Sequence, residues 1–135
     1  MLTDNKCVFC QIIKRKIPAQ IVYEDELFLG FLDSRPLNPG HTLLIPKKHY
    51  RWVDDIPEFG LYFETAKKLA KAIRKAFQPA TIFYLTMGFG VPHAHIHLVP
   101  KHEHDGLGEG ILIKYVKKIP PEEMKKIQLQ IKQNI

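Results

Sequence analysis

The sequence lacks the features that define several large classes of protein. No apolar run in its 135 residues approaches the roughly 18–20 residues that a membrane-spanning helix needs, so we expect no membrane association. Two cysteines are too few for the disulfide framework of a small secreted protein. Residues 1–6 lack the basic start and apolar core of a signal peptide, so a cytoplasmic protein is expected. There is no internal repeat and no low-complexity tract.

The composition is that of a globular protein with a basic balance. Hydrophobic residues make up 45% of the chain and charged residues 25%. The length suits a single domain over residues 1–135, with its core at about 7–100 and a C-terminal loop and helix at 101–135. The formal net charge of +6 favours anionic partners. Because the lysines are spread out and not interleaved with aromatic residues, nucleic acid is not the expected partner.

Hydrophobic periodicity predicts an α+β fold. Apolar runs bounded by turn residues predict strands at 20–23, 27–32, 41–45 and 81–85. Apolar residues recur at helical spacing over 57–77, with Asp54 or Asp55 as the expected N-cap. A short helix is expected over 8–13 and a final amphipathic helix over 121–131. Strands around one long helix predict a mostly antiparallel sheet of about five strands.

Three histidines, His93, His95 and His97, stand at every second position of the run 91–100. Apolar residues alternate with them, which predicts a strand with all three imidazoles on one face. Three interpretations are open: a metal site, nucleophilic attack by a neutral imidazole on an activated phosphorus, or histidines with ordinary hydrogen bonds. Ligation of one metal by all three strains the geometry, and strict alternation disfavours the last interpretation.

A second group of candidate residues begins with Cys7 and Cys10. The pair has three interpretations: half of a zinc site, a redox pair, or two buried thiols. The redox interpretation is disfavoured because no strand is predicted ahead of the pair. Zinc needs two further ligands, for which the sequence offers His49 and the histidine row. His102 and His104 are competing candidates, although we expect them in a solvated loop.

Several segments, in the same order, resemble the histidine triad (HIT) family of nucleotide hydrolases and transferases. The run His-Ala-His-Ile-His-Leu-Val at 93–99 is similar to the family's His-x-His-x-His-apolar-apolar signature. Similar segments precede it at 7–13, 17–19, 23–26, 31–33 and 40–49, so the resemblance covers nearly all of the chain to about residue 100. It implies a HIT-like α+β fold, and a homodimer formed through the long helix and an adjacent strand.

The resemblance implies a role for each matching histidine. His95 would attack the α-phosphorus of a purine nucleotide conjugate, of AMP or GMP type, and give a nucleotidyl-histidine intermediate that water hydrolyses. His97 would hydrogen-bond the phosphate and the leaving atom, and His41 would orient the row. The implied enzyme is a hydrolase or nucleotidyl transferase for nucleoside phosphoramidates or dinucleoside polyphosphates.

The resemblance also implies binding residues and a metal. Asp33 corresponds to the acid that binds the ribose hydroxyls. The residues that match the apolar pocket for the base are Phe9, Ile12, Ile17 and Phe31. The ligands of one tetrahedral zinc ion would be Cys7, Cys10, His49 and His93. Four protein ligands leave no open position, so this zinc is expected to be structural.

Residues 85–91 depart from the family pattern. The segment is shorter than usual, lacks the family's asparagine, and has Phe89 and Gly90 where glutamine and serine are expected. We expect the backbone N–H groups of Gly90 and Val91 to donate to phosphate instead, with Thr86 as a candidate side-chain donor. Fewer donors weaken transition-state stabilisation. The departure therefore motivates an alternative: a nucleotide-binding regulatory protein with little turnover.

Overall fold

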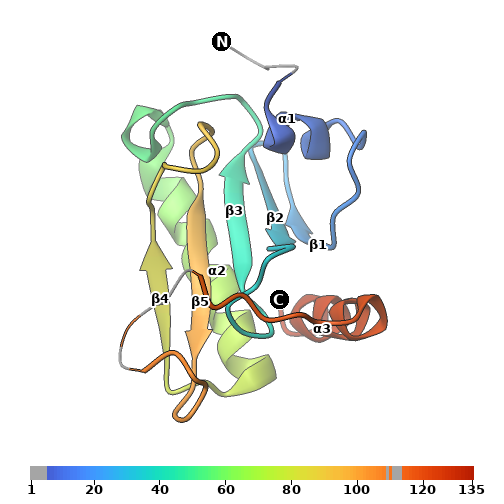
Figure 1. Ribbon diagram of the computed structural model, residues 1–135. Helices are drawn as coiled ribbons and strands as arrows, with labels where there is room; N and C mark the ends of the chain where they lie inside the picture. The colour runs from blue at the N-terminus through green and yellow to red at the C-terminus, as the bar shows by residue number, and fades with distance from the viewer. Residues whose placement is uncertain (1–5, 109, 111–113) are drawn as a thin grey trace.

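The chain forms one antiparallel sheet with helices packed on it (Figure 1). The computed structural model describes residues 6–108, 110 and 114–135. In chain order the elements are α1 (Val8–Ile13), β1 (Ile21–Glu24), β2 (Phe28–Leu32), β3 (Thr42–Pro46), η1 (Val53–Asp55), α2 (Phe59–Phe77), β4 (Thr81–Leu85), β5 (Ile96–Lys101) and α3 (Pro121–Gln133). The strands pair in the order β1-β2-β3-β5-β4, each pair antiparallel. This confirms the predicted α+β fold.

The two faces of the sheet bury different sets of side chains. Phe28 and Leu44 pack into the cluster that includes α2, whereas Leu29 and Leu43 pack with α1. Because side chains alternate along a strand, β2 and β3 are buried on both faces. His97 pairs directly with Leu43 in the β3–β5 register, and directly paired residues share a face. The alternation therefore places His97 on the face that α1 covers.

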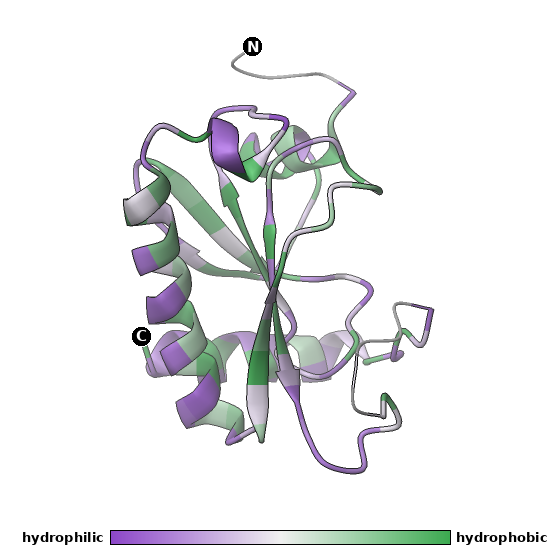
Figure 2. Cartoon of the chain, turned by 90° about the vertical axis from the view of Figure 1, so that its left-hand side faces the viewer, coloured by the Kyte–Doolittle hydropathy of each residue, from purple (hydrophilic) through white to green (hydrophobic). Residues whose placement is uncertain are grey.

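Helix α2 lies on the opposite face of the sheet, and hydrophobic and hydrophilic residues alternate along it (Figure 2). It begins at Phe59, after Glu58 as an N-cap that makes no side-chain hydrogen bond. The expected cap at Asp54 or Asp55 is therefore wrong. The carboxylate of Asp55 instead accepts a hydrogen bond from the backbone N–H of Trp52 at 3.2 Å, which commits it to the short η1 turn.

Helix α3 packs against α2 and β1. Ile127 and Ile131 are buried in the same cluster as α2. The side chain of Gln128 donates a hydrogen bond to the carbonyl of Ile21 at 2.7 Å. The helix thus joins the edge strand β1 to α2, and it runs two residues beyond the predicted end.

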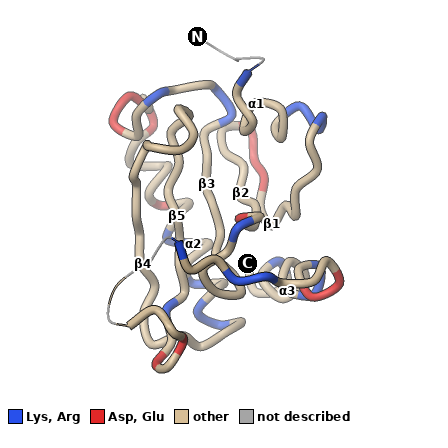
Figure 3. Tube along the Cα trace, in the orientation of Figure 1, with Lys and Arg blue, Asp and Glu red and all other residues tan. Residues whose placement is uncertain are grey.

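Basic residues lie on several elements, including the α1–β1 connection, α2 and α3, and do not form one stripe (Figure 3). Among the described residues no helix is long and apolar enough to span a bilayer. The first five residues, which contribute to the expected lack of a signal peptide, lie outside the described residues.

β5 begins at Ile96, so the predicted strand over the whole histidine row is wrong. Only His97 belongs to the strand, and His93 and His95 precede it in irregular chain. The backbone N–H of His93 donates to the carbonyl of Val91 at 2.9 Å, within a tight turn, and is not available to a sheet ladder. As a result, His93 lies in a group of cysteines and histidines, whereas His95 and His97 line a cavity.

Candidate active site and metal centre

A cavity of about 670 Å³ opens on the face of the sheet that α1 covers. Its wall comes from α1, the end of β2, the segment before β5 and the start of α3. Both His95 and His97 line it. All of the residues predicted to bind nucleotide also line it: Phe9, Ile12, Ile17, Phe31, Asp33, Gly90 and Val91. The structure therefore brings the predicted binding residues and two of the predicted catalytic histidines to one cavity.

The hydrogen bonding of His95 fixes which ring nitrogen carries a proton. Its Nδ1 lies 2.6 Å from the carbonyl oxygen of His93, and since a carbonyl only accepts, Nδ1 donates. The ring of Phe9 packs edge-on at 5.1 Å between centroids. Burial lowers the pKa of His95, and the bond to the His93 carbonyl opposes this effect. The result is a neutral imidazole with a lone pair on Nε2.

A chain of hydrogen bonds sets the tautomers of the other two histidines. The backbone N–H of Leu37 donates to Nδ1 of His41 at 3.1 Å, so the proton of neutral His41 is on Nε2. That nitrogen lies 2.9 Å from Nδ1 of His97, which must then accept. His97 therefore carries its own proton on Nε2. His41 does not line the cavity but lies behind His97.

Burial keeps these two imidazoles neutral near pH 7. It lowers the pKa of His41 to about 3, with the neighbouring His97 contributing. It lowers the pKa of His97 to about 4, with His95 contributing. Burial also raises the pKa of Asp33, although the N–H of Arg35 donates to its Oδ1 at 2.9 Å. Oδ2 of Asp33 is 3.4 Å from Nε2 of His41, so the carboxylate borders both the histidine chain and the cavity.

Two thiols and two imidazoles meet where α1 lies against the sheet. Sγ of Cys7 is 3.3 Å from Nδ1 of His93, and Sγ of Cys10 is 3.2 Å from Nδ1 of His49 and 3.6 Å from that of His93. The four atoms lie within 4.8 Å of one another. Nε2 of His93 is 2.9 Å from the carbonyl oxygen of Pro46, so it donates there. This leaves the lone pair of Nδ1 directed at the sulfurs.

The donor set and its spacing fit a tetrahedral zinc ion. With Zn–S near 2.3 Å and Zn–N near 2.05 Å, a regular tetrahedron has S···N edges of about 3.6 Å, close to the observed separations. Burial raises the pKa of the Cys7 thiol to about 11, so its thiolate is disfavoured unless a cation lies beside it. The contact of His93 with Pro46 is the outer-shell bond typical of a ligating histidine. His102 and His104 belong to no such group.

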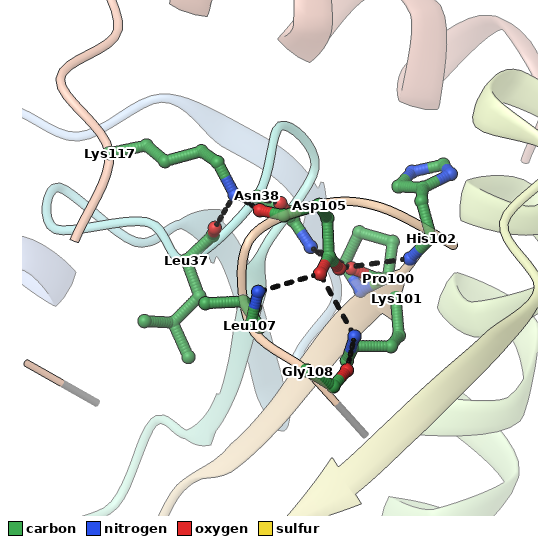
Figure 4. A network of polar contacts seen from close by, with 9 residues as sticks. All are labelled: Leu37, Asn38, Pro100, Lys101, His102, Asp105, Leu107, Gly108 and Lys117. Atoms are coloured by element: carbon green, nitrogen blue, oxygen red, sulfur yellow. Dashed lines mark hydrogen bonds and ion pairs between the residues drawn. The ribbon is translucent and has the colours of Figure 1, made fainter. Parts of the chain in front are cut away.

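A polar network around Asp105 and Lys117 holds Leu37 and Asn38 in place (Figure 4). Asp105 accepts hydrogen bonds from Asn38 and Lys101, both at 2.9 Å. The ammonium group of Lys117 donates to the carbonyl of Leu37 at 2.8 Å and to the Asn38 side chain. Because the Leu37 N–H sets the tautomer of His41, this network supports the histidine chain from outside the cavity.

Sequence reasoning missed several residues that border the site. Ile119 and Met124, from the segment at the start of α3, line the cavity. Arg51 lines a smaller adjoining cavity of about 120 Å³, and its Nη2 donates to the carbonyl of Gly88 at 3.0 Å. In the sequence, the one feature that points to Arg51 is its position two residues after the expected zinc ligand His49. No periodicity marks the residue.

Fold and site together define a class: an antiparallel sheet that presents a chain of neutral histidines to a deep cavity beside a Cys₂His₂ group. The model of the HIT domain matches residues 14–104, more than half of the chain. The protein therefore belongs to the histidine triad (HIT) family, which confirms the resemblance found in the sequence.

Curated relatives include proteins with named activities. The chain is 42% identical over 106 residues to an uncharacterized HIT-like protein of Methanocaldococcus jannaschii, covering 74% of this chain and 82% of that one. It is 37% identical to the adenylylsulfatase HINT3 of Arabidopsis thaliana, covering 77% of this chain and 56% of the relative. It is 36% identical to the adenosine 5′-monophosphoramidase HNT1 of Saccharomyces cerevisiae, covering 74% and 65%. These names support a nucleotide-binding hydrolase.

Solved structures have the same fold over the whole chain. A HIT-like protein of Bartonella henselae superposes with a TM-score of 0.82 at 32% identity, covering 100% of both chains. A zinc-bound histidine triad protein of Mycobacterium smegmatis superposes with a TM-score of 0.77 at 30% identity, covering 96% of this chain and 92% of that one.

Proposed function

We propose that this protein is a hydrolase that cleaves nucleotide conjugates at the α-phosphate, with His95 as nucleophile. The observation that carries the proposal is the tautomer of His95. Its Nδ1 is committed to the His93 carbonyl, while Nε2 has no hydrogen-bond partner among the described residues, and His95 lines the cavity. A neutral, buried imidazole with a free lone pair is a nucleophile suited to phosphorus.

The residues that line the cavity support one orientation for the nucleotide. Phe9, Ile12 and Phe31 offer an apolar wall for the base. The carboxylate of Asp33 accepts hydrogen bonds from the ribose hydroxyls. This arrangement puts the α-phosphate at His95 and His97, where the backbone N–H groups of residues 90 and 91 are available as donors.

The reaction then proceeds in two displacements. Nε2 of His95 forms a bond to the α-phosphorus while the bond from phosphorus to the leaving group breaks, and that group departs with the electron pair. A phosphoramidate reacts in its N-protonated form, so that its nitrogen departs as the neutral amine. Nδ1–H stays on the ring, so the adduct is an imidazolium that the His93 carbonyl stabilises through the 2.6 Å bond. Nε2–H of His97 hydrogen-bonds the negative charge that develops. Water then attacks the phosphorus, releases the nucleoside monophosphate and a proton, and restores neutral His95.

We further propose that Cys7, Cys10, His49 and His93 hold a structural zinc ion. The spacing of the four ligand atoms and the presence of zinc in the M. smegmatis relative support this assignment. When bound, zinc would neutralise the thiolates and cross-link α1 to the segments that follow β3 and precede β5. His93 supplies both a ligand through Nδ1 and, through its carbonyl, the acceptor for His95. The metal group thereby fixes the position of the nucleophile.

A homodimer through α2 and the edge strand β4 is part of the proposal. Phe59, Leu61 and Tyr84 are exposed apolar residues on these two elements, and β4 ends the sheet. An unpaired strand edge beside apolar helix residues favours association of two copies. Analytical ultracentrifugation at micromolar concentration checks this, and a monomer there would contradict it.

The alternative function is nucleotide binding with little turnover. It is favoured by the segment before β5, where Phe89 is 96% exposed and supplies no polar group to phosphate. Mass spectrometry of protein quenched during incubation with adenosine 5′-phosphoramidate separates the two functions. The hydrolase gives a nucleotidyl adduct on His95 and a steady release of AMP. Saturable binding with neither adduct nor AMP release would favour the regulatory protein.

A further inference from the structure

A second cavity, of about 120 Å³, adjoins the nucleotide cavity. His95, Met87 and Gly88 line both cavities. Asp33 and Phe9, expected at the ribose and the base, line only the larger one. The small cavity therefore borders His95 on the side away from Asp33 and Phe9, where the leaving group of a nucleotide bound at His95 would lie.

Arg51 is the cationic residue among those that line the small cavity, and one of its nitrogens is unsatisfied. Nη2 donates to the Gly88 carbonyl at 3.0 Å, and the guanidinium stacks 3.8 Å above the ring of Trp52. Nη1 is buried and has no hydrogen-bond partner among the described residues. Asp54 lines the same cavity but forms no ion pair with Arg51. A buried guanidinium N–H without an acceptor lowers the stability of the fold. We therefore expect Nη1 of Arg51 to donate to a bound ligand.

The volume of the small cavity and the polar groups on its wall indicate which kind of ligand it can hold. At about 30 Å³ per water molecule, the cavity has room for roughly four waters, comparable to one tetrahedral oxyanion. Arginine stays charged at all accessible pH values and donates in a fork that suits sulfate and phosphate oxygens. Thr86 also lines the small cavity, and its hydroxyl is a candidate second donor.

We propose that Arg51 and Thr86 form an oxyanion subsite for the leaving group, which makes nucleoside phosphoric anhydrides the preferred substrates. Adenosine 5′-phosphosulfate and ADP are substrates of this class, with sulfate or phosphate as leaving group. Phosphoramidates, which release a neutral amine, do not use the subsite. The inference rests on the proposed hydrolase function of His95 and names its substrate class.

Comparing two substrates in an Arg51→Gln variant tests the subsite. We expect kcat/KM for adenosine 5′-phosphosulfate to fall about tenfold to hundredfold, the range for a lost charge-assisted hydrogen bond. For adenosine 5′-phosphoramidate it should change by less than about threefold. Lys48→Gln removes the same formal charge from an exposed neighbour and should leave both values unchanged. An equal fall for both substrates would overturn the subsite, because it would mean that Arg51 only supports Gly88.

A binding measurement tests the oxyanion subsite without requiring that the protein hydrolyse its ligand. Calorimetry compares AMP with adenosine 5′-(α,β-methylene)diphosphate, whose bridging carbon resists hydrolysis. In the parent we expect the diphosphate to bind at least about tenfold more tightly, and in Arg51→Gln about as tightly as AMP. If the parent hydrolyses neither substrate but shows this preference, the hydrolase proposal fails and the oxyanion subsite stands. Equal affinities in the parent would overturn the subsite even if hydrolysis occurs.

Discussion

Two polar clusters are connected through His41, which bonds to Leu37 of one and to His97 of the other, and they differ in how completely their atoms are paired. Around Asp105, both carboxylate oxygens accept two hydrogen bonds each, from Lys101 and the Leu107 N–H and from Asn38 and the His102 N–H. In the histidine site, by contrast, Nε2 of His95 and His97 and Nη1 of Arg51 have no partner among the described residues.

The difference separates a structural cluster from a functional one. Buried polar groups are almost always hydrogen-bonded, so a group that is fully paired within the chain stabilises the fold. Unpaired atoms that face a cavity are retained at a cost to stability, which indicates a ligand. A substitution in the Asp105 cluster should lower the stability of the fold and leave the activity nearly unchanged. A substitution in the histidine site should lower the activity far more than the stability.

The largest expected effect is that of His95→Ala. Loss of the nucleophile should lower the hydrolysis rate by at least about a thousandfold. The thermal midpoint should fall by only a few degrees, because the substitution also removes the Nδ1 bond to the His93 carbonyl and the contact with Phe9. Steady-state assays measure the hydrolysis rate, and calorimetric melting measures the thermal midpoint. His102→Ala is the matched control, because it removes an imidazole that does not line the large cavity and keeps the backbone N–H that donates to Asp105. Parent-level activity in His95→Ala would end the mechanistic proposal.

Next in size is the loss of a metal ligand through Cys7→Ala. Zinc content should fall from about one ion per chain to near zero. The thermal midpoint should fall by roughly 10 °C, as expected for a few kcal/mol in a chain of this length. Elemental analysis and melting curves with and without chelator measure both. A chelator should lower the midpoint of the parent and leave that of the variant unchanged; equal shifts would exclude this site.

Asp105→Asn tests the fully paired cluster. Although burial acts to raise it, hydrogen bonds from Lys101, Leu107 and Asn38 hold the pKa of Asp105 below its ordinary value. Its side chain is 5% exposed and that of Lys101 is 8% exposed, so removing the charge leaves a buried ammonium unpaired. We expect a loss of about 3–5 kcal/mol in the free energy of unfolding by urea.

The exposed pair Glu64–Lys67, at 2.9 Å with side chains 65% and 54% exposed, is the matched control. Glu64→Gln should cost less than about 0.5 kcal/mol. Well below its melting temperature, Asp105→Asn should retain most of the parent's kcat. A thousandfold loss of kcat in the folded variant would erase the distinction between the two clusters.

The positions of the first four strands and of the long helix could be predicted, because each is an apolar run or an apolar period in the local sequence. The two faces of β2 and β3 could not be told apart in this way, since both strands are almost wholly apolar and only the fold shows that Leu29 and Leu43 face α1 while Phe28 and Leu44 face α2. The start of β5 could not be predicted in this way. The N–H of Ala94 bonds to the carbonyl of Tyr50 at 2.7 Å, a contact with a segment more than 40 residues away that competes with the strand pattern.

Some residues of the candidate site could also be predicted from the sequence, and others could not. The residues of the large cavity and of the Cys₂His₂ group were predicted by resemblance, since they stand in recognisable segments. Arg51 and Asp105 were missed because each is one charged residue in a stretch without periodicity. Their environments depend on residues far along the chain: Asp105 meets Asn38, and Arg51 meets Gly88. Only the assembled fold separates such residues from solvated charges.

The smallest predicted effect is a difference in pH dependence. His41 has a folded pKa of about 3 against about 6.5 in the unfolded chain, so the unfolded state binds more protons between these values. Its contribution to stability is complete above pH 6.5 and is lost as the pH falls toward 3. The Asp105 contribution has the same sign but is lost only below about pH 3.9.

Replacement of His41 by glutamine, which keeps a side-chain amide for His97 but does not titrate, isolates this difference. Between pH 6 and pH 4.5 the slope of unfolding free energy against pH should be smaller than in the parent by about 1.4 kcal/mol per pH unit, the value for one proton. Urea titrations at several pH values measure it. Parallel curves for parent and variant would mean that His41 is protonated in the folded state, and the tautomer chain that presents Nε2–H of His97 to the cavity would have to be redrawn.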